Sequence, residues 1–303
     1  MGDSGCRLQA SGCGPVWPRA DGSPGGDAAR RTTAPRRTDR RARTLLVIGA
    51  ALCGFTLTVV AATVPSNVVA MAPPAEHTVP FKVGETLEYD VGWSSYLTAG
   101  TATLAIREKK PSYGSVAYYA VAEGRATGLV AALYHVYYKA DTLLDVYSLL
   151  PQRGSIYGEE GHRRRMRATR FNQARRTAQY EVTPSAGHQK PIALPGPTHD
   201  ALSVVLALRT LSLREKLSVT LPVSDGGRVF RVQATVHERQ RLSTRLGQLM
   251  AWRVEPAILG DNGEIGASKL TLWLSDDARR WPLLMEAEMP VGKFTLTLRS
   301  AVR

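Results

Sequence analysis

Histidine and carboxylate side chains are the first candidates for chemistry in this 303-residue chain. A metal site commonly holds its ligands at short spacings such as His-x-His or His-x-x-x-His. No such pair occurs among the six histidines, which are His77, His135, His162, His188, His199 and His237. His199 beside Asp200 comes nearest, but at the start of a predicted helix both residues favour capping, with Asp200 interacting with the helix dipole. We therefore predict no metal site and no other cofactor.

A serine nucleophile or a pair of catalytic acids has little support. The chain contains no Gly-x-Ser-x-Gly motif, which would place a serine on a sharp turn. Ser203 follows His199 by four residues, but no oxyanion donors are identifiable. Glu159 and Glu160 look like an acid pair, yet neighbouring residues on a strand point to opposite faces. We therefore predict that the protein is not an enzyme.

One enzymatic alternative stays open, a hydrolase that acts on envelope polymer. Such an enzyme would need two carboxylates that converge about 5 to 10 Å apart in a cleft. The candidate acids are Asp141, Asp145, Glu159 and Asp200.

Positive charge is concentrated in residues 162–176. This segment holds seven arginines, which are Arg163, Arg164, Arg165, Arg167, Arg170, Arg175 and Arg176. A nucleic-acid site would interleave aromatic side chains for stacking, and only Phe171 is present, so we predict no nucleic-acid partner. Two interpretations remain: a solvated hairpin, or contact with an anionic surface such as lipid headgroups. The residues predicted to make that contact are Arg163, Arg164, Arg165, Arg167 and Arg170.

Aromatic side chains form the last group of candidates. In a curved sheet they could line a cavity for an apolar or amphiphilic ligand, while packing in the core is the alternative for most of them. The predicted lining residues are Tyr89, Trp93, Tyr134, Tyr138, Trp252 and Trp273.

The first 80 residues are expected to lie outside the folded domain. Residues 1–43 are rich in Gly, Pro, Ser and Arg and predict a disordered basic tail. Residues 44–64 carry no charge and follow an arginine run, which predicts a signal peptide or a transmembrane anchor. Residues 65–80 are a predicted linker. We expect an exported protein, either periplasmic or anchored to the inner membrane with its domain in the periplasm.

Composition adds two constraints. The three cysteines, Cys6, Cys13 and Cys53, all precede the predicted domain, so that domain can have no disulfide and no thiolate site. The formal net charge is +13, which favours anionic partners without selecting one.

Alternation of apolar and polar residues from residue 81 onward predicts a sheet. In residues 86–93 one face carries Leu87, Tyr89, Val91 and Trp93, while Glu88 and Asp90 point the other way. Residues 101–106 alternate in the same manner, as an antiparallel partner would. Two strands alone are marginal in water, so more must follow.

The remaining elements predict the fold class. Residues 153–160 and 162–171 predict a hairpin around Gly161, and residues 127–136 a turn of helix that runs into a strand. Residues 184–197 are a predicted loop. Residues 198–211 predict the clearest helix, with Thr198 as N-cap. With about a dozen strands, residues 81–303 are expected to form a mainly β domain, a curved antiparallel sheet or open β-barrel with one packed helix.

Several short motifs together resemble a known family. They are Phe81-x-x-Gly84-Glu85-x-Leu87-x-Tyr89, Trp93, Gly100, the strand at 141–151, the helix at 200–209, the segment 272–277, Arg280, Pro282 and Gly292. Their order and spacing resemble the domain of unknown function 3108 family of bacterial exported proteins. The resemblance implies an exported β-rich domain and supplies no catalytic residues.

The predicted function is that of a cell-envelope protein that binds an apolar or amphiphilic ligand or an envelope partner. The partners in view are a lipid or other amphiphile, an anionic membrane surface, or an envelope protein. A purely structural role in an envelope complex is the third possibility, beside the hydrolase. Analogy of architecture with periplasmic lipoprotein carriers favours ligand binding, and it is analogy only.

Overall fold

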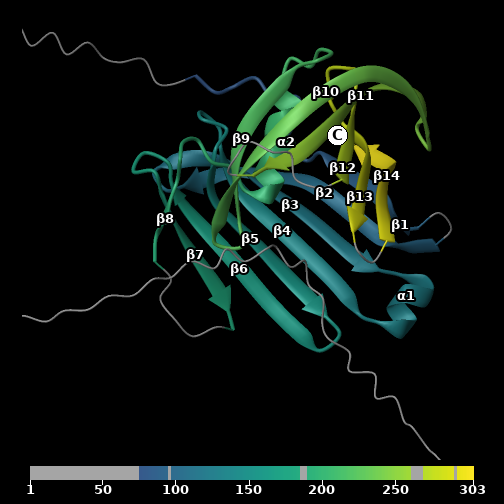
Figure 1. Ribbon diagram of the computed structural model, residues 1–303, viewed down its shortest axis with the longest axis horizontal. Helices are drawn as coiled ribbons and strands as arrows, with labels where there is room; N and C mark the ends of the chain where they lie inside the picture. The colour runs from purple at the N-terminus through teal and green to yellow at the C-terminus, as the bar shows by residue number, and fades with distance from the viewer. Residues whose placement is uncertain (1–74, 95–96, 185–189, 261–268, 290–291) are drawn as a thin grey trace, which may run out of the picture. The chain divides into compact units, whose positions relative to one another are not determined.

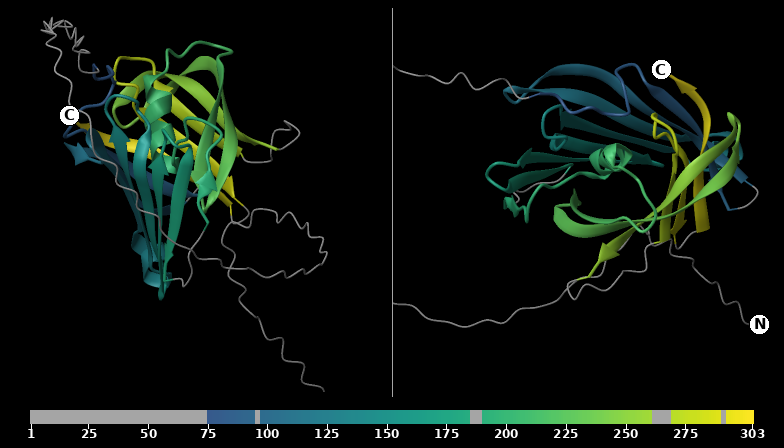
Figure 2. Two further views of the ribbon diagram at one scale, coloured as in Figure 1. Left: turned by 90° about the vertical axis from the view of Figure 1, so that its left-hand side faces the viewer. Right: turned by 90° about the horizontal axis from the view of Figure 1, so that it is seen from above.

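The computed structural model describes residues 75–94, 97–184, 190–260, 269–289 and 292–303. Over these residues the chain forms one antiparallel sheet of fourteen strands, together with two helices (Figure 1). The strands follow the order β8-β7-β6-β5-β4-β3-β2-β1-β14-β13-β12-β11-β10-β9, so β8 and β9 are the two edges. The sheet curls without closing (Figure 2, right). The predicted mainly β class with a curved antiparallel sheet is confirmed.

The strands and helices have the following bounds. The first eight strands are β1 Thr86–Trp93, β2 Leu97–Ser112, β3 Ser115–Ala126, β4 Val136–Asp145, β5 Pro151–Glu160, β6 Arg163–Asn172, β7 Thr177–Thr183 and β8 Ile192–Ala193. The other six are β9 Ser218–Asp225, β10 Arg228–Thr244, β11 Gly247–Leu259, β12 Lys269–Ser275, β13 Pro282–Met289 and β14 Gly292–Val302. The helices are α1 Gly128–Leu133 and α2 Ala201–Thr210.

Strand β1 lies at the centre of the sheet, between β2 and β14. Its predicted alternation is confirmed, because Leu87 and Tyr89 are fully buried on one face. On the other face Glu88 accepts hydrogen bonds from Arg299 at 2.9 Å and from Ser300 at 2.6 Å. The two faces of the sheet therefore differ as the sequence pattern predicts, apolar on the inside of the curve and polar outside.

Helix α2 lies inside the curve of the sheet (Figure 2, right). Leu202 and Leu206 pack with Tyr89 and Leu104 in one apolar cluster. Leu208 belongs to a second cluster formed with strands β10 to β12. Burial of each such leucine stabilises the fold by about 1.5 to 3 kcal/mol. Helix α2 thus packs against both halves of the curved sheet, through one cluster on each side.

The long β10–β11 hairpin bends back over the outside of the sheet. A register shift between Val236 and Arg239 breaks the regular pairing, and such bulges bend strands and increase their twist. Arg245 in the hairpin turn lies 2.7 Å from Asp90 on β1, although four strands separate β10 from β1 in the sheet. Leu249 of the hairpin belongs to the cluster that contains buried Trp273. The outer face of the C-terminal strands is therefore partly covered.

The two edges of the sheet approach one another near α2. A Cβ placed at Gly227, in the β9–β10 turn, would lie 2.8 Å from the ring of Tyr180 on β7. Arg167 on β6 lies 3.7 Å from Asp225 on β9. These contacts join β6 and β7, which lie next to the edge strand β8, to β9 and the turn that follows it, and we call this place the seam.

Several predicted details are wrong. The N-cap of α2 is Asp200 and not Thr198, because the Asp200 carboxylate accepts hydrogen bonds from the amides of Leu202 and Ser203. Residue 199 is kept extended by a parallel bridge to Val223. The short strand β8 lies within the predicted loop. By contrast, the turn of helix predicted at residues 127–136 is confirmed as α1, which is not packed in the core and is followed by strand β4.

The N-terminal predictions fall mostly outside the described residues. The disordered tail at 1–43, the signal or anchor segment at 44–64 and residues 65–74 of the linker are not described. Residues 75–80 of the linker contact the domain, since the amide of His77 donates to the carbonyl of Val146 at 3.2 Å and Val79 packs on the core. Among the described residues, neither helix has the length and apolar character needed to cross a bilayer.

Candidate functional site

The inner face of the sheet continues beyond α2 as a band of apolar side chains. On β4 the inner residues are Thr142, which contacts the start of α2, followed by Ala140 and Tyr138, which lie progressively farther from the helix. The strand register identifies the inner residues of the other strands, because paired residues on neighbouring strands point to the same face of the sheet. We call this band the inner strip.

Residues of the inner strip are only partly buried. Tyr138 and Leu270 are 40% and 38% exposed. Side chains of intermediate burial complete the strip, and they are Val91, Ala102, Ala122, Ala140, Ile156, Leu221, Val232, Ile258, Met285 and Leu296. Single exposed apolar residues are ordinary on protein surfaces, whereas a contiguous apolar surface indicates an interaction site.

Charged groups stand beside the strip on β5 and β6. Arg165 pairs in register with Gly158, and Arg167 with Ile156, so both arginines belong to the inner face. Arg167 forms an ion pair with Asp225 at 3.7 Å, whereas Arg165 is exposed and has no ion pair among the described residues. Glu160 accepts a hydrogen bond from the hydroxyl of Tyr138, and desolvation, followed by this bond, raises the pKa of Tyr138 to about 12. The strip therefore combines an apolar surface with an exposed cation, Arg165, beside it.

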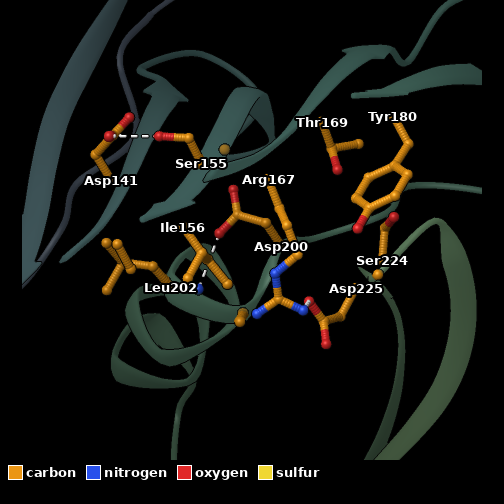
Figure 3. A pocket seen from close by; sticks show the side chains of 14 residues that line it. Asp141, Ser155, Ile156, Arg167, Thr169, Tyr180, Asp200, Leu202, Ser224 and Asp225 are labelled. Atoms are coloured by element: carbon orange, nitrogen blue, oxygen red, sulfur yellow. Dashed lines mark hydrogen bonds and ion pairs between the residues drawn. The ribbon is translucent and has the colours of Figure 1, made fainter. Parts of the chain in front are cut away.

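A small pocket lies where α2 meets the seam (Figure 3). Asp200 forms one wall, with its carboxylate 2.6 Å from the hydroxyl of Thr142 and close to Gly154, where a Cβ would lie 2.6 Å from the Asp200 oxygen. Tyr180 and Ser224 lie on the opposite side. Its volume of about 30 Å³ suits roughly one water molecule, whereas small-molecule sites are commonly 300–1,000 Å³. This pocket is therefore too small for an amphiphile.

His199 and Ser203 are brought together, but in a capping arrangement. Ser203 Oγ accepts from the Asp200 amide at 2.9 Å and lies 3.4 Å from His199 Nδ1. All three residues are buried. Burial lowers the pKa of His199 to about 4 and raises the pKa of Asp200, although hydrogen bonds from Thr142 and the α2 amides oppose the latter effect. A fully buried hydroxyl that completes a capping box stabilises the helix end.

The other candidate acids are each engaged in local structure. Asp141 accepts from Ser155 at 2.6 Å on the outer face of β4, opposite to Asp200 (Figure 3). Burial of Asp145 would raise its pKa, but hydrogen bonds led by the one from Ser115 lower it overall. Glu159 lies near the far end of β5, where hydrogen bonds from Tyr157 and His135 lower its pKa. The predicted opposite orientation of Glu159 and Glu160 is confirmed by their partners on opposite faces. No two of these carboxylates share a hydrogen-bond partner.

The predicted aromatic lining is dispersed. Tyr138 lies in the inner strip, and Tyr134 follows α1. Trp93 shares the inner face with Val91 by register and stacks on Phe294 at 6.2 Å. Tyr89 is buried in the core, where its hydroxyl donates to the Pro282 carbonyl at 3.0 Å. Of the remaining two, Trp252 donates to Asp276 at 2.7 Å, and Trp273 is buried with the β10–β11 hairpin. A ligand cavity lined by these six residues stays a prediction.

The predicted arginine surface is divided by the strand itself. Alternation places Arg163, Arg165 and Arg167 on the inner face and Arg164 and Arg170 on the outer face. Arg170 lies 3.8 Å from Glu181, and Arg164 lies 3.5 Å from Glu159. Contact with an anionic surface stays a prediction for these five residues.

A family model described as a protein of unknown function (DUF3108) matches residues 88–299. The chain belongs to this family. The resemblance inferred from the sequence is thereby confirmed, and residues 88–299 of this DUF3108 chain include the inner strip, α1 and α2. No curated protein matches the chain.

Three solved structures are similar to the DUF3108 chain at low identity. A beta-barrel-like protein of domain of unknown function DUF1849 from Brucella abortus is 11% identical with a TM-score of 0.48, covering 72% of this chain and 96% of its own. A DUF1089 family protein from Pseudomonas aeruginosa is 10% identical, with a TM-score of 0.34 and coverage of 63% and 90%. A protein from Bacteroides fragilis, named for a YmcC-like fold and for inferred export, is 10% identical, with a TM-score of 0.30 and coverage of 76% and 100%.

The structure unites Glu85, Arg209 and Trp281 in a buried polar cluster that sequence reasoning missed. Arg209 of α2 lies 2.7 Å from Glu85, and both side chains are almost completely buried. Trp281 Nε1 donates to the second Glu85 oxygen at 3.2 Å, and Arg209 also donates to the carbonyls of Arg279 and Arg280. The signal available in the sequence was Arg209, a charged residue that follows the apolar run of residues 204–208. Among the described residues, no three His, Cys, Asp or Glu side chains are grouped as metal ligands.

Proposed function

We propose that this domain is a non-catalytic envelope protein that holds an apolar or amphiphilic ligand against its inner strip. The observation that carries the proposal is the partial exposure of apolar side chains on the inner face of the curved sheet, beyond the end of α2. Burial of such surface by a hydrocarbon chain is favourable at about 25 cal/mol for each Å² removed from water. Export of the domain, to the periplasm or to the outside of the inner membrane, is part of the proposal and rests on the uncharged segment 44–64.

Charge at the side of the strip favours an anionic amphiphile. Arg165 is exposed on the inner face, next to the row that contains Ile156 and Arg167. A guanidinium can bind a carboxylate or phosphate through two parallel hydrogen bonds. A fatty acid or a phospholipid would thus place its acyl chain along the strip and its headgroup at Arg165.

Photolabelling with a diazirine-bearing fatty acid tests the proposal. The purified full chain is irradiated with the probe, and modified peptides are located by mass spectrometry. Adducts are expected on inner residues of β4, β5 and β12, such as Tyr138 and Leu270. A matched pair of variants supplies the control, because Ala140→Trp fills the strip whereas Lys139→Trp adds the same ring to the outer face of the same strand. Ala140→Trp should abolish these adducts and Lys139→Trp should retain them.

The opposite result is equally clear. Adducts confined to residues 1–74, or inner-face adducts that persist in Ala140→Trp, would remove the support for ligand binding on the strip. Thermal unfolding of both variants establishes that each remains folded.

A further inference from the structure

Helix α1 is apolar on every side, yet it is not buried. It reads Gly-Leu-Val-Ala-Ala-Leu, and none of its residues is buried. Leu129 and Leu133 are 63% and 77% exposed. A helix that is hydrophobic all round is normally enclosed by protein or lipid. The described part of the chain supplies no such cover, so α1 is a candidate contact surface.

The β5–β6 turn contacts the residues that directly follow α1. The amide of Gly161 donates to the carbonyl of His135 at 2.8 Å. A Cβ at Gly161 would lie 3.1 Å from the ring of Tyr134, which is 51% exposed. Both features lie at the end of the sheet where β3 ends and β4 begins (Figure 1; Figure 2, left). We call residues 127–135 together with residues 160–165 the α1 tip.

Positive charge is concentrated at the same end of the sheet as this apolar surface. The exposed arginines at or next to the α1 tip are Arg125, Arg163, Arg164 and Arg165. The nearest acids are already engaged, since Glu159 contacts His135 at 2.9 Å and Arg164 at 3.5 Å, and Glu160 accepts from Tyr138. Glu123 lies 3.7 Å from Lys139. Arginine therefore remains in excess around α1.

We propose that the α1 tip docks on an anionic lipid bilayer. Interfacial helices bury their apolar side chains about 5–10 Å into the boundary between headgroups and acyl chains, and cationic side chains add attraction to anionic lipids. The α1 tip has both parts, with Leu129 and Leu133 for the boundary and the exposed arginines at residues 163–165 for lipid phosphates. The complementary charge favours an anionic bilayer over an apolar protein groove.

This docking goes beyond ligand binding on the inner strip and does not depend on it. The strip runs from α2 toward the same end of the sheet, because Tyr138 lies four residues after Tyr134 on the strand that follows α1. A docked tip would therefore bring the open end of the strip to the membrane surface.

An environment-sensitive fluorophore on α1 tests the docking in the full chain. Cys6, Cys13 and Cys53 are first replaced by serine, and Leu129→Cys is labelled with a nitrobenzoxadiazole group. The matched control label is at Tyr113→Cys, which is also 63% exposed but lies in the β2–β3 turn at the opposite end of the sheet. Both proteins are reconstituted into vesicles of phosphatidylcholine alone or with phosphatidylglycerol. Emission at residue 129 should shift to the blue only with phosphatidylglycerol, and emission at residue 113 should stay constant.

Paired arginine variants test the charge requirement. Arg163→Gln with Arg165→Gln removes two exposed charges at the α1 tip, whereas Arg175→Gln with Arg176→Gln removes two exposed charges in the turn after β6, at the opposite end. Near an anionic leaflet the first pair should lower the ratio of docked to free tips about thirty-fold. The second pair should leave that ratio unchanged.

Three results would overturn the proposal. They are equal emission at residues 129 and 113 in every vesicle, an equal shift at residue 129 without anionic lipid, and equal effects of the two arginine pairs. The photolabelling result on the inner strip bears on ligand binding alone, so failure of one proposal is distinguishable from failure of the other.

Discussion

Arg209 is the most deeply buried cation among the described residues. Its guanidinium lies 2.7 Å from Glu85, with exposures of 0% and 1% for the two side chains. It also lies 5.4 Å from the ring of Phe81. Desolvation of both charges is costly, and their mutual attraction together with the hydrogen bonds around them offsets that cost. The pair joins α2 to the segment before β1 and to the residues before β13, which are 124 and about 70 positions away in sequence.

Removal of one partner should be far worse than removal of both. Arg209→Met leaves the buried Glu85 side chain without its cationic partner, and we expect it to lower the free energy of unfolding by about 3–5 kcal/mol. Arg209→Met combined with Glu85→Gln should recover much of this loss, since the amide can still accept from Trp281. Urea unfolding followed by tryptophan fluorescence measures both. Exposed Arg214→Met is the control, expected to change stability by less than about 0.5 kcal/mol. A single variant as mild as this control would contradict the assigned role of the pair.

His199 makes the stability depend on pH. Burial lowers its pKa to about 4 in the folded state, whereas an unfolded histidine has a pKa of about 6.5. Between these values the unfolded chain binds a proton that the folded chain does not. The free energy of unfolding should therefore fall by roughly 3 kcal/mol as the pH drops from 6.5 to 4.

Comparison with His199→Asn isolates this contribution. The backbone contacts of residue 199 with Pro222 and Ser224 remain in the variant. Burial raises the pKa of neighbouring Asp200, so its folded state retains a proton and its contribution to stability increases as the pH falls, opposite to that of His199. This contribution is common to both proteins. The difference between the two urea stability curves should stay level above pH 6.5 and change steadily below it. A constant difference across the whole range would show that His199 is not the titrating group.

At the scale of elements, the start of α2 is held by close contact with β4 and β5. Asp200 caps the helix and also accepts from Thr142 on β4. Gly154 on β5 permits this approach, since a Cβ there would lie 2.6 Å from the Asp200 carboxylate and 3.0 Å from its Cβ. The start of α2 is therefore positioned by the Asp200 carboxylate and by the absence of a Cβ at Gly154.

Gly154→Ala should displace the capped end of α2. Overpacking of this kind costs about 1–3 kcal/mol, and thermal or urea unfolding measures it. Gly124→Ala on β3 is the matched control, because its nearest neighbours to an added Cβ are at 3.9 and 4.0 Å. That variant should be neutral or slightly stabilising. Equal effects of the two alanines would mean that Asp200 moves aside without cost.

At the scale of the whole molecule, the seam keeps the sheet curled. Tyr180 on β7 meets Gly227 in the β9–β10 turn, and the Arg167–Asp225 contact lies nearby. The ion pair is partly exposed, so it contributes at most about 1 kcal/mol. Packing of the buried Tyr180 ring therefore stabilises the seam more than the ion pair does.

Tyr180→Ala should open the seam while the central strands persist. Large aromatic-to-alanine changes in cores cost about 3–5 kcal/mol. Native-state hydrogen exchange should accelerate in β7 and β9, whereas amides of β1 to β3 should lose protection only with global unfolding. Asp225→Asn is the milder companion, expected to leave exchange in β9 nearly unchanged. Uniform acceleration in all strands of the Tyr180 variant would show that the seam is not a separate unit.

Patterns of short range carry much of the fold. The alternation at Leu87 and Tyr89 predicts the buried face of β1, and the hairpin around Gly161 follows from turn chemistry. The spacing of Leu202 and Leu206 predicts α2, because neighbours on a helix face recur every three or four residues. The predicted N-cap is wrong, since Thr198 and Asp200 are both good caps and only the bridge between His199 and Val223 keeps residue 199 out of the helix.

Contacts of long range decide the candidate surfaces. Trp273 and Tyr138 are both aromatic strand residues, yet a bent hairpin covers one and leaves the other partly exposed. Likewise the arginines of residues 163–170 are close together in the sequence, but strand alternation places them on two faces. Some of them lie near the exposed apolar residues of α1, because the β5–β6 turn contacts the residues that follow this helix.

By itself the sequence determined that residues beyond 81 form strands with one apolar face, since side-chain alternation is a property of each strand alone. It also determined the family, through motifs of fixed order. Only the tertiary structure decided how far the sheet curls, which apolar residues stay uncovered, and that Glu85 meets Arg209. Those outcomes depend on contacts between residues far apart in the chain, whose energies no local pattern contains.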